Sequence, residues 1–375
     1  MNREILAVVA MSVGVVVATE SAEAQSIRVF SSLSGVTASN ANGISKDGST
    51  VVGLSDGDLP RATRQVSGGG VENLGALSAT GFSTASGVSG DGSVVVGWAA
   101  TFGGENDRAV RWTSSGGLQS LGVLSGDSSS VAWGVSGDGS TIVGQSFGNQ
   151  SRAFRWTSGG GMQALGLLSP LATGSQAVSA SDDGSTIVGS IYGPLYGGQA
   201  VRWTSSGVEG LGFLAGFDRS YAYGVSGDGL KIVGQSSLEN SDIARAFLWS
   251  GNSMQDLGVL AGQTSSIAVQ VSDDGSTVVG YCTDADFNIT AMIWQSGVGM
   301  TSLSDALLSR GVDLTGWDKL ESALDISADG RFIVGNGVFN GENRGFVVDL
   351  GMPVPAPGAL GLLGLAAAVG GRRRR

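Results

Sequence analysis

The sequence predicts an all-β fold made of repeats, and three observations carry this prediction. Of the 375 residues, 64 are Gly, a content that indicates many tight turns between short strands. Hydrophobic residues make up 41% of the chain, which is enough for a folded core. The string Ser-x-Asp-Gly occurs seven times, and a Gly follows each Asp after six residues. The Asp residues of this string are Asp47, Asp91, Asp138, Asp183, Asp228, Asp274 and Asp329.

Each repeat is predicted to contain four strands, as the third one illustrates. Residues 132–136 lead into the Asp-Gly turn, where Gly tolerates a positive φ and Asp can hydrogen-bond the local backbone. The β-branched residues 141–143 follow, then the alternating residues 152–156, and a fourth strand begins at Met162. Four strands in about 45 residues are typical of one blade of a β-propeller.

The two ends of the array predict how it closes. A fourth-strand pattern, apolar-x-x-Leu, occurs in six repeats, whereas the last repeat stops after its third strand at residues 344–348. A further copy of the pattern at residues 30–33 precedes the first repeat. We therefore expect residues 25–351 to form a seven-bladed β-propeller in which this N-terminal strand completes the last blade, so that no edge is exposed. A linear β-solenoid, which would need capping units, is the alternative.

One insertion interrupts the regular spacing, just before the seventh turn. Residues 304–310, with an N-cap-like Ser304 and with Gly311 as a stop, predict a short helix on the rim of the ring.

Residues 1–24 have the three parts of a signal peptide. Arg3 provides a positive start, residues 5–18 are apolar, and a small-x-small site ends at Ala24. We expect cleavage between Ala24 and Gln25, and therefore an exported protein.

Residues 352–375 are predicted to be a sorting or anchor segment. A Pro-rich break precedes the apolar residues 358–371 and a basic end, an order that suits a membrane-held tail. The break and the basic end are Val354, Pro355, Ala356, Pro357, Arg372, Arg373, Arg374 and Arg375. This tail resembles the PEP-CTERM sorting signal, which an exosortase processes, although Ala356 stands where that family usually has Glu. The resemblance implies transient membrane anchoring and a place in the cell envelope, on the cell surface or outside the cell.

The repeats resemble those of the HAF-type extracellular repeat family. The segments that carry the resemblance are AWGVSGDGSTIVG and RAFRWT, and they recur in variant form over residues 27–349. Membership of this family implies an exported repeat protein and brings no catalytic residues to this chain.

The residues that could do chemistry are few. The chain has no His and one Cys, Cys282, which rules out the usual Ser-His-Asp triad, an imidazole metal site and an internal disulfide. The repeated Asp residues are predicted to be structural turn residues, because seven equivalent turns need seven equivalent residues. No catalytic, cofactor or metal residue is predicted. Calcium at the adjacent carboxylates 182–183 and 273–274 is the alternative.

Aromatic residues fall into two groups. A periodic set in the third strand, Trp112, Trp156, Trp203, Trp249 and Trp294, is predicted to pack between neighbouring blades. The aromatic residues outside this set are the candidates for ligand specificity. They are Trp98, Trp133, Tyr192, Tyr196, Tyr221, Tyr223, Tyr281 and Trp317.

Charge and export together limit the function. Residues 1–24 carry a net charge of −2 and the tail +4, which leaves −13 on the rest of the chain. Such a domain repels phosphate backbones, so nucleic acid is not expected as a partner, and membrane contact is expected only through the C-terminal segment. The sequence predicts a protein that is not an enzyme and has a structural or interaction role in the cell envelope or extracellular matrix. Its expected partners are the export and sorting machinery and extracellular polysaccharide or other surface proteins.

Two other functions stay open at this point. One is a lectin-like propeller that binds polysaccharide through its aromatic residues. The other is a carboxylate-based glycosidase or lyase, which would need a pair of carboxylates about 5–9 Å apart.

Overall fold

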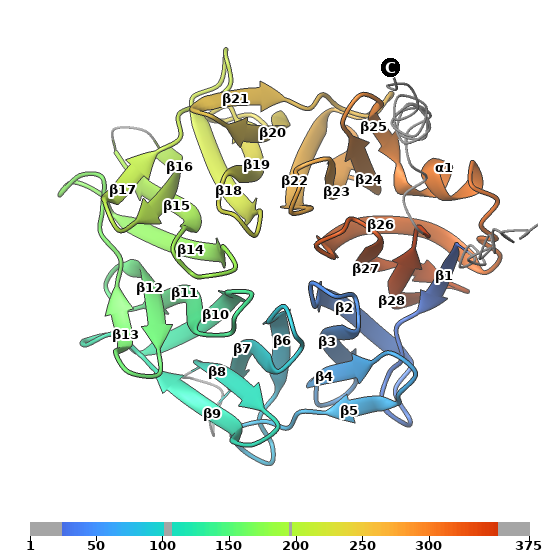
Figure 1. The fold of residues 1–375 in the computed structure, drawn as a ribbon, viewed down its shortest axis with the longest axis horizontal. Coiled ribbons are helices and arrows are strands. Elements are labelled where there is room, and N and C mark those ends of the chain that lie inside the picture. The colour runs from blue at the N-terminus through green and yellow to red at the C-terminus, as the bar shows by residue number, and fades with distance from the viewer. Residues whose placement is uncertain (1–24, 101–106, 195–196, 352–375) are drawn as a thin grey trace, which may run out of the picture.

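The fold is a closed ring of seven four-stranded antiparallel sheets (Figure 1). The computed structural model describes residues 25–100, 107–194 and 197–351. The seven sheets stand around a common centre, with the first strand of each nearest to it. The prediction of an all-β, seven-bladed β-propeller is confirmed.

The strands of the blades follow one another along the chain. Blade 1 contains β2 (Ala38–Ile44), β3 (Thr50–Asp56), β4 (Arg61–Val66) and β5 (Val71–Asn73). Blade 2 contains β6 (Ser83–Val88), β7 (Val94–Ala100), β8 (Asp107–Thr113) and β9 (Gly117–Gly122). Blade 3 contains β10 (Ser129–Val135), β11 (Thr141–Phe147), β12 (Ser151–Thr157) and β13 (Gly161–Ala164). Blade 4 contains β14 (Gly174–Ala180), β15 (Ile187–Gly193), β16 (Gly197–Thr204) and β17 (Gly207–Gly210).

The remaining three blades include the junction of the two chain ends. Blade 5 contains β18 (Arg219–Val225), β19 (Lys231–Ser237), β20 (Ala244–Ser250) and β21 (Ser253–Asp256). Blade 6 contains β22 (Ser265–Val271), β23 (Thr277–Thr283), β24 (Ile289–Gln295) and β25 (Gly299–Ser302). Blade 7 contains β26 (Trp317–Ile326), β27 (Phe332–Phe339), β28 (Glu342–Asp349) and β1 (Ser26–Val29).

The N-terminal strand completes the last blade, as predicted, but in a different register. Strand β1 pairs antiparallel with β28, with Ser26 opposite Asp349 and Val29 opposite Phe346. The predicted strand, residues 30–33, lies just beyond it. An apolar residue stands at 27, 30 and 33, so the apolar-x-x-apolar pattern fits two registers, and the sequence does not distinguish them.

The Asp-Gly turns share one hydrogen-bond pattern, shown here for the third blade. The Ser136 hydroxyl donates to Asp138 Oδ1 at 2.5 Å, and the backbone N–H of Ser140 donates to the same oxygen at 2.9 Å. The N–H of Thr141 donates to Ser136 Oγ at 3.0 Å. Gly139 has a φ of +70°, which favours Gly at that position. We call the side of the ring that carries these seven turns the turn face and the opposite side the loop face.

The Gly that follows each Asp by six residues is required by a close approach of two strands. A Cβ added to Gly144 in β11 would lie 2.0 Å from the carbonyl oxygen of Val131 in β10. The corresponding Gly residues of the other blades have contacts of 1.9–2.0 Å of the same kind. Each contact lies beside a bulge in the first strand, where one residue has no partner in the second strand.

The core lies between blades, and the periodic Trp residues are part of it. Trp156 of blade 3, for example, packs with Val96 and Ala109 of blade 2 and is 7% exposed. Burial of this kind at every junction holds neighbouring sheets face to face.

The predicted helix is present and begins earlier than expected. Helix α1 (Leu303–Leu308) is capped by Ser302, whose hydroxyl accepts the N–H of Asp305 at 3.0 Å, and not by Ser304. Leu303 and Leu307 are completely buried against blades 6 and 7 at the outer edge of the ring (Figure 1).

Candidate functional site

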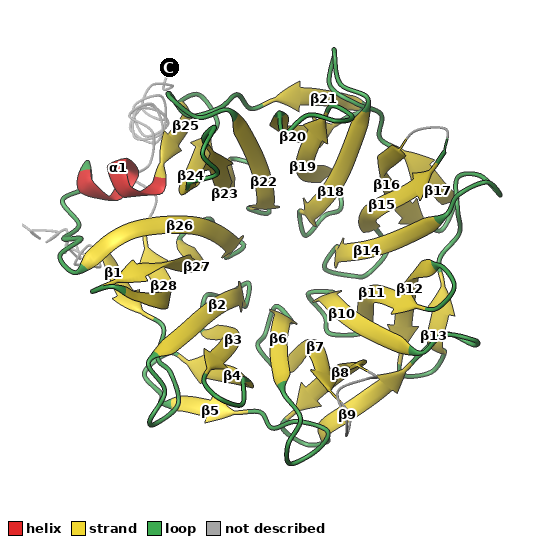
Figure 2. Ribbon diagram, turned by 180° about the vertical axis from the view of Figure 1, so that it is seen from behind, coloured by secondary structure: helices red, strands yellow, loops and turns green. Residues whose placement is uncertain are grey.

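The bulged residues of the seven first strands line a cavity at the centre of the ring. The cavity has a volume of about 650 Å³. Figure 2 shows the seven first strands arranged around this centre. The bulged residues are Asn42, Ser86, Trp133, Val178, Tyr223, Val269 and Leu324. Bulges turn side chains out of the strand pattern, and here they turn one side chain per blade toward a shared space.

The wall of this central cavity is largely apolar. A ring of aliphatic residues lies nearer to the turn face, and Trp98 of β7 adds a second indole beside that of Trp133. The aliphatic residues are Ile44, Val88, Val135, Ala180, Val225, Val271 and Ile326. Polar side chains complete the lining, and apolar walls with polar groups that can orient a ligand are typical of small-molecule sites. These polar residues are Asn42, Lys46, Thr84, Ser86, Ser179, Tyr223, Gln270, Asp273 and Asp325.

Asp325 is one of these polar groups, and it lies where the last blade meets the first. Its two carboxylate oxygens accept the backbone N–H groups of Ile44, at 2.8 Å, and of Ile326, at 2.9 Å. Desolvation raises its pKa to about 6, against the lowering effect of these hydrogen bonds and of the Lys46 charge.

A second cavity, of about 660 Å³, opens on the loop face over blades 4, 5 and 6. We call it the tyrosine pocket, because Tyr192, Tyr221 and Tyr223 line it. The rings of Tyr192 and Tyr221 lie 6.2 Å apart, centroid to centroid, at an angle of 40°. Amide, hydroxyl and carboxylate side chains complete the lining, among them Gln176, Gln235, Asn240, Ser241 and Asp242.

Burial keeps the phenols of Tyr192 and Tyr223 uncharged. Burial, with the neighbouring phenols as a smaller cause, raises the pKa of Tyr192 to about 12, and it raises the pKa of Tyr223 and Tyr281 as well. Neutral phenols donate and accept hydrogen bonds and present flat apolar rings. The cation among the lining residues, Arg219, is paired with Glu239.

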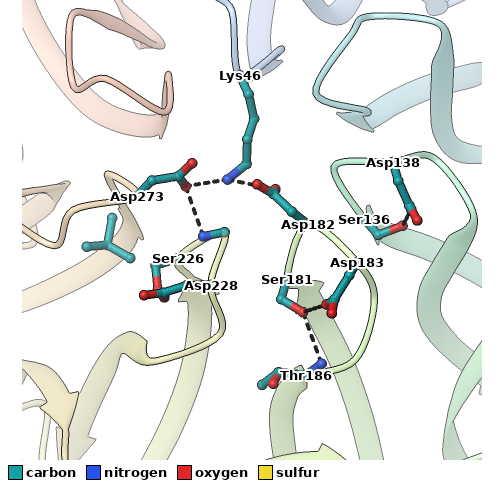
Figure 3. Close-up of polar contacts among 12 residues, drawn as sticks. Lys46, Ser136, Asp138, Ser181, Asp182, Asp183, Thr186, Ser226, Asp228 and Asp273 are labelled. Atoms are coloured by element: carbon teal, nitrogen blue, oxygen red, sulfur yellow. Dashed lines mark hydrogen bonds and ion pairs between the residues drawn. The ribbon is translucent and has the colours of Figure 1, made fainter.

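The turn-face mouth of the central cavity is crossed by a lysine. Lys46 of blade 1 reaches over the centre and pairs with Asp182 of blade 4, at 2.9 Å, and with Asp273 of blade 6 (Figure 3). Asp273 Oδ1 also accepts the N–H of Gly227 of blade 5 at 2.9 Å. Desolvation alone would lower the pKa of Lys46, but the hydrogen bonds and charges of the two carboxylates outweigh it and raise that pKa.

The carboxylate pairs considered for calcium do not converge on a common point. Asp183 accepts from Ser181 and Ser185 within its own turn, whereas Asp182 is directed to Lys46 (Figure 3). Among the residues that the structure describes, no three Asp, Glu, Cys or His side chains are grouped so as to hold a metal ion. Cys282 is buried, with its sulfur 3.6 Å from that of Met300.

The structure brings most of the candidate specificity residues together. Trp98, Trp133 and Tyr223 line the central cavity, and Tyr223 joins Tyr192 and Tyr221 in the tyrosine pocket. Trp317 lies elsewhere: it packs edge-on against Phe339, at 5.1 Å between ring centroids, in the core of blade 7. Tyr196 lies outside the described residues.

Sequence reasoning missed Lys46 and Asp325 of the central cavity, and it considered Asp182 and Asp273 only as calcium ligands. The repeat motif A-x-G-(V/I)-S-x-D-G contains a signal that could have found most of them. Its first variable position supplies the seven bulged residues, and its second supplies Lys46, Asp182 and Asp273. The two variable positions of this motif therefore supply residues of the central cavity and of its turn-face mouth.

The signal peptide, the sorting motif and the membrane tail all fall outside the described residues. Within the part of the chain that is described, no helix is long and apolar enough to cross a membrane.

Solved structures share this fold at low sequence identity. An oligogalacturonate lyase from Vibrio parahaemolyticus is similar over 87% of this chain and 97% of that one, with a TM-score of 0.57 and 13% identity. An oligogalacturonate lyase in complex with manganese matches over 87% and 96%, with a TM-score of 0.54 and 14% identity. A prolyl endopeptidase matches over 88% and 50%, with a TM-score of 0.55 and 12% identity. The chain matches no protein-family profile, and no curated protein sequence matches it.

These similarities define the class of the protein as a β-propeller built from repeats, and they correct one prediction. The sequence predicted that the chain is not an enzyme, yet two of the solved structures with this ring are lyases. The absence of His and of a non-repeated carboxylate pair is therefore no ground for excluding catalysis. At 13–14% identity the likeness concerns the fold and brings no activity to this chain.

Proposed function

We propose that the chain is an exported β-propeller that binds a carbohydrate in the tyrosine pocket of its loop face. One observation carries the proposal: tyrosines that are not part of the repeat pattern meet in a single pocket of about 660 Å³. Flat phenol rings suit the apolar faces of sugar rings, and the surrounding amides and hydroxyls suit their hydroxyl groups.

The charge of the pocket favours a neutral sugar. Arg219 is already paired with Glu239, Asp242 adds a negative charge, and the chain without its two ends carries −13. An anionic chain such as the oligogalacturonate for which two fold neighbours are named would meet repulsion here.

Export and retention at the cell surface belong to the same proposal. They are supported by the N-terminal segment, with its cleavage site before Gln25, and by the resemblance of the C-terminal segment to a sorting signal. A sugar-binding ring held at the envelope would attach the cell to polysaccharide or organise an extracellular matrix.

A glycan array probed with the purified protein tests the sugar-binding proposal. Tyr221→Ala is expected to lower binding to the positive glycans at least tenfold. Phe287→Ala is the matched control, because Phe287 is 66% exposed on the loop face and does not line the pocket. The positive glycans should also be incubated with the protein and analysed for cleavage products, since the fold is shared with lyases. Equal binding by Tyr221→Ala and the parent would exclude the tyrosine pocket as the site.

A further inference from the structure

We propose that the central cavity is a blind pocket that receives the end of the bound sugar chain, and that the protein therefore recognises chain ends rather than chain interiors. This inference rests on the proposed function and adds how the sugar is bound.

The turn-face mouth of the cavity is crossed by charged side chains. Lys46, Asp182 and Asp273 occupy it, and the equivalent position in three other blades is Gly. A Cβ on Gly137 would lie 2.3 Å from Asp182 Oδ1, and one on Gly227 would lie 2.7 Å from Lys46 Nζ. Contacts this short show that the side chains of Asp182 and Lys46 lie directly against these two glycines, where a larger residue would not fit.

Hydrogen bonds join neighbouring blades around the turn-face mouth. Six of the seven blade junctions have a hydrogen bond at this level, with lengths of 2.9–3.0 Å. They run from Gly90 to Gly137, Asp138 to Asp182, Asp182 to Gly227, Gly227 to Asp273, Asp273 to Ala328 and Ala328 to Lys46. A rim held in this way cannot widen without breaking several bonds, so the turn face offers no passage for a sugar chain.

The central cavity and the tyrosine pocket are neighbours that share one lining residue, Tyr223. Tyr223 lines both spaces, because it is the bulged residue of β18 and faces the centre of the ring. A chain that stacks on Tyr221 and Tyr223 therefore lies beside the central cavity of about 650 Å³, and its end can enter that cavity past Tyr223. That volume is within the range of about 300–1,000 Å³ typical of small-molecule sites, so the end of a sugar chain fits. A chain that continued through the ring would have to pass Lys46 at the turn-face mouth.

The chemistry of the cavity suits a neutral terminal sugar. The indoles of Trp98 and Trp133 offer flat apolar surfaces, and the amide of Asn42 can hydrogen-bond a sugar hydroxyl. The ammonium of Lys46 is already engaged by two carboxylates and is not free to hold an anion.

Blocked sugar chains distinguish end recognition from recognition along the chain. The probes are linear hexasaccharides of glucose, mannose or xylose, either free, or blocked at one end or at both ends by a bulky fluorescent group. For the hexasaccharide that binds, we expect the free form and one singly blocked form to bind, and the doubly blocked form to bind at least tenfold more weakly. Equal binding of the free and doubly blocked forms would overturn the inference.

Filling the cavity provides a second, independent measurement. Ser86→Trp places an indole at a bulged position of the central cavity that does not line the tyrosine pocket, and Ser115→Trp on an exposed turn is the matched control. Ser86→Trp is expected to weaken binding of the free hexasaccharide at least tenfold, and the control to leave it unchanged. Val178 is another bulged residue of the central cavity, so Val178→Phe repeats the test if Ser86→Trp does not fold.

The outcomes separate the two proposals. If no hexasaccharide binds, or if Tyr221→Ala binds like the parent, the sugar-binding proposal fails and the inference fails with it. A different result separates them: Tyr221→Ala abolishes binding, the parent binds the doubly blocked hexasaccharide normally, and Ser86→Trp binds the free hexasaccharide normally. In that case the sugar-binding proposal is supported and the inference that the central cavity receives the chain end is wrong.

Discussion

Asp325 of the last blade accepts the backbone N–H of Ile44 of the first blade, with 2.8 Å between oxygen and nitrogen. The contact spans the junction at which the two ends of the repeat array meet. Four other blades have Gly at the position of Asp325, so the ring contains this carboxylate hydrogen bond at one junction. A single titratable group therefore takes part in ring closure.

The stability contribution of Asp325 should depend on pH. Desolvation raises its pKa to about 6 from 3.8, so the folded ring binds this proton more tightly than the unfolded chain does. The contribution is fully present below about pH 4 and is lost as the pH rises through 6. One pKa unit corresponds to about 1.4 kcal/mol, so the change is roughly 3 kcal/mol at most. Asp325→Asn should remove this dependence, and urea denaturation of both proteins at pH 4, 5, 6 and 7 measures it. If the free energies of unfolding of the parent and of Asp325→Asn change with pH by the same amount, the prediction is wrong.

The charged residues that cross the turn-face mouth should stabilise the ring modestly. Lys46→Met leaves Asp182 and Asp273 facing each other without a cation, and we expect a loss of about 1 kcal/mol, near the upper end for partly exposed ion pairs. The loss should shrink in 1 M salt, which screens such charges. Lys319→Met is the control, because Lys319 pairs with Glu321 of its own strand and is more exposed. A Lys46 variant as stable as the control variant would show that the bridge adds nothing to stability.

The Asp-Gly turns should respond to loss of the Asp in two ways. Asp138→Ala removes three hydrogen bonds from the third turn and should cost about 1 kcal/mol. Those bonds, from Ser136 and Ser140, outweigh partial desolvation and lower the pKa of Asp138. Its contribution is therefore present above pH 4 and lost as the pH falls through the folded-state pKa. Thermal unfolding at pH 7 and pH 3, with the exposed Asp58→Ala as control, measures both effects. If Asp138→Ala binds sugar more weakly than the parent at an unchanged melting temperature, the turn has a role other than structure.

Closure of the ring should depend on Phe30. Its side chain is completely buried among residues of blades 1 and 7, and its N–H donates to the carbonyl of Gly345 at 2.7 Å. Phe30→Ala should cost about 3–5 kcal/mol, as for other buried Phe residues. Phe287→Ala, at an exposed position, should change stability by less than about 0.5 kcal/mol.

Deletion of residues 26–29 tests closure more severely, because it exposes the edge of β28. We expect a large fall in melting temperature and association that increases with protein concentration. A truncated chain that stays monomeric and melts with the parent would show that β1 is dispensable.

The ring could be predicted from the sequence because the same strand pattern occurs in seven repeats. Seven copies of one pattern identify the strands of a blade even where a single copy does not. The ends lack this support: only one copy of β1 exists, and its apolar spacing fits two registers. The N-cap of α1 was misplaced for a similar reason, since Ser302 and Ser304 are equally suitable by residue type.

The candidate site was predictable only in part. Tyr192, Tyr221 and Tyr223 stand out in the sequence because they do not repeat, but their meeting depends on the curvature of the ring and on a bulge in β18. Nothing near Lys46 in the sequence indicates Asp182 or Asp273, which lie three and five repeats away. Contacts across a ring join residues whose separation depends on the number of blades, so they follow only once that number is known.

Pairing of β1 with β28 also sets an order of events during synthesis. Strand β1 leaves the ribosome before any blade exists, and its partner is made last, so the longest loop in the molecule closes at the final step. Until then β1 has no partner and blade 7 has no outer strand. A chain that ends prematurely, or that lacks the last repeat, keeps this strand unpaired and remains exposed to proteolysis and aggregation. The seam between the two ends therefore forms only in a chain that contains both β1 and β28.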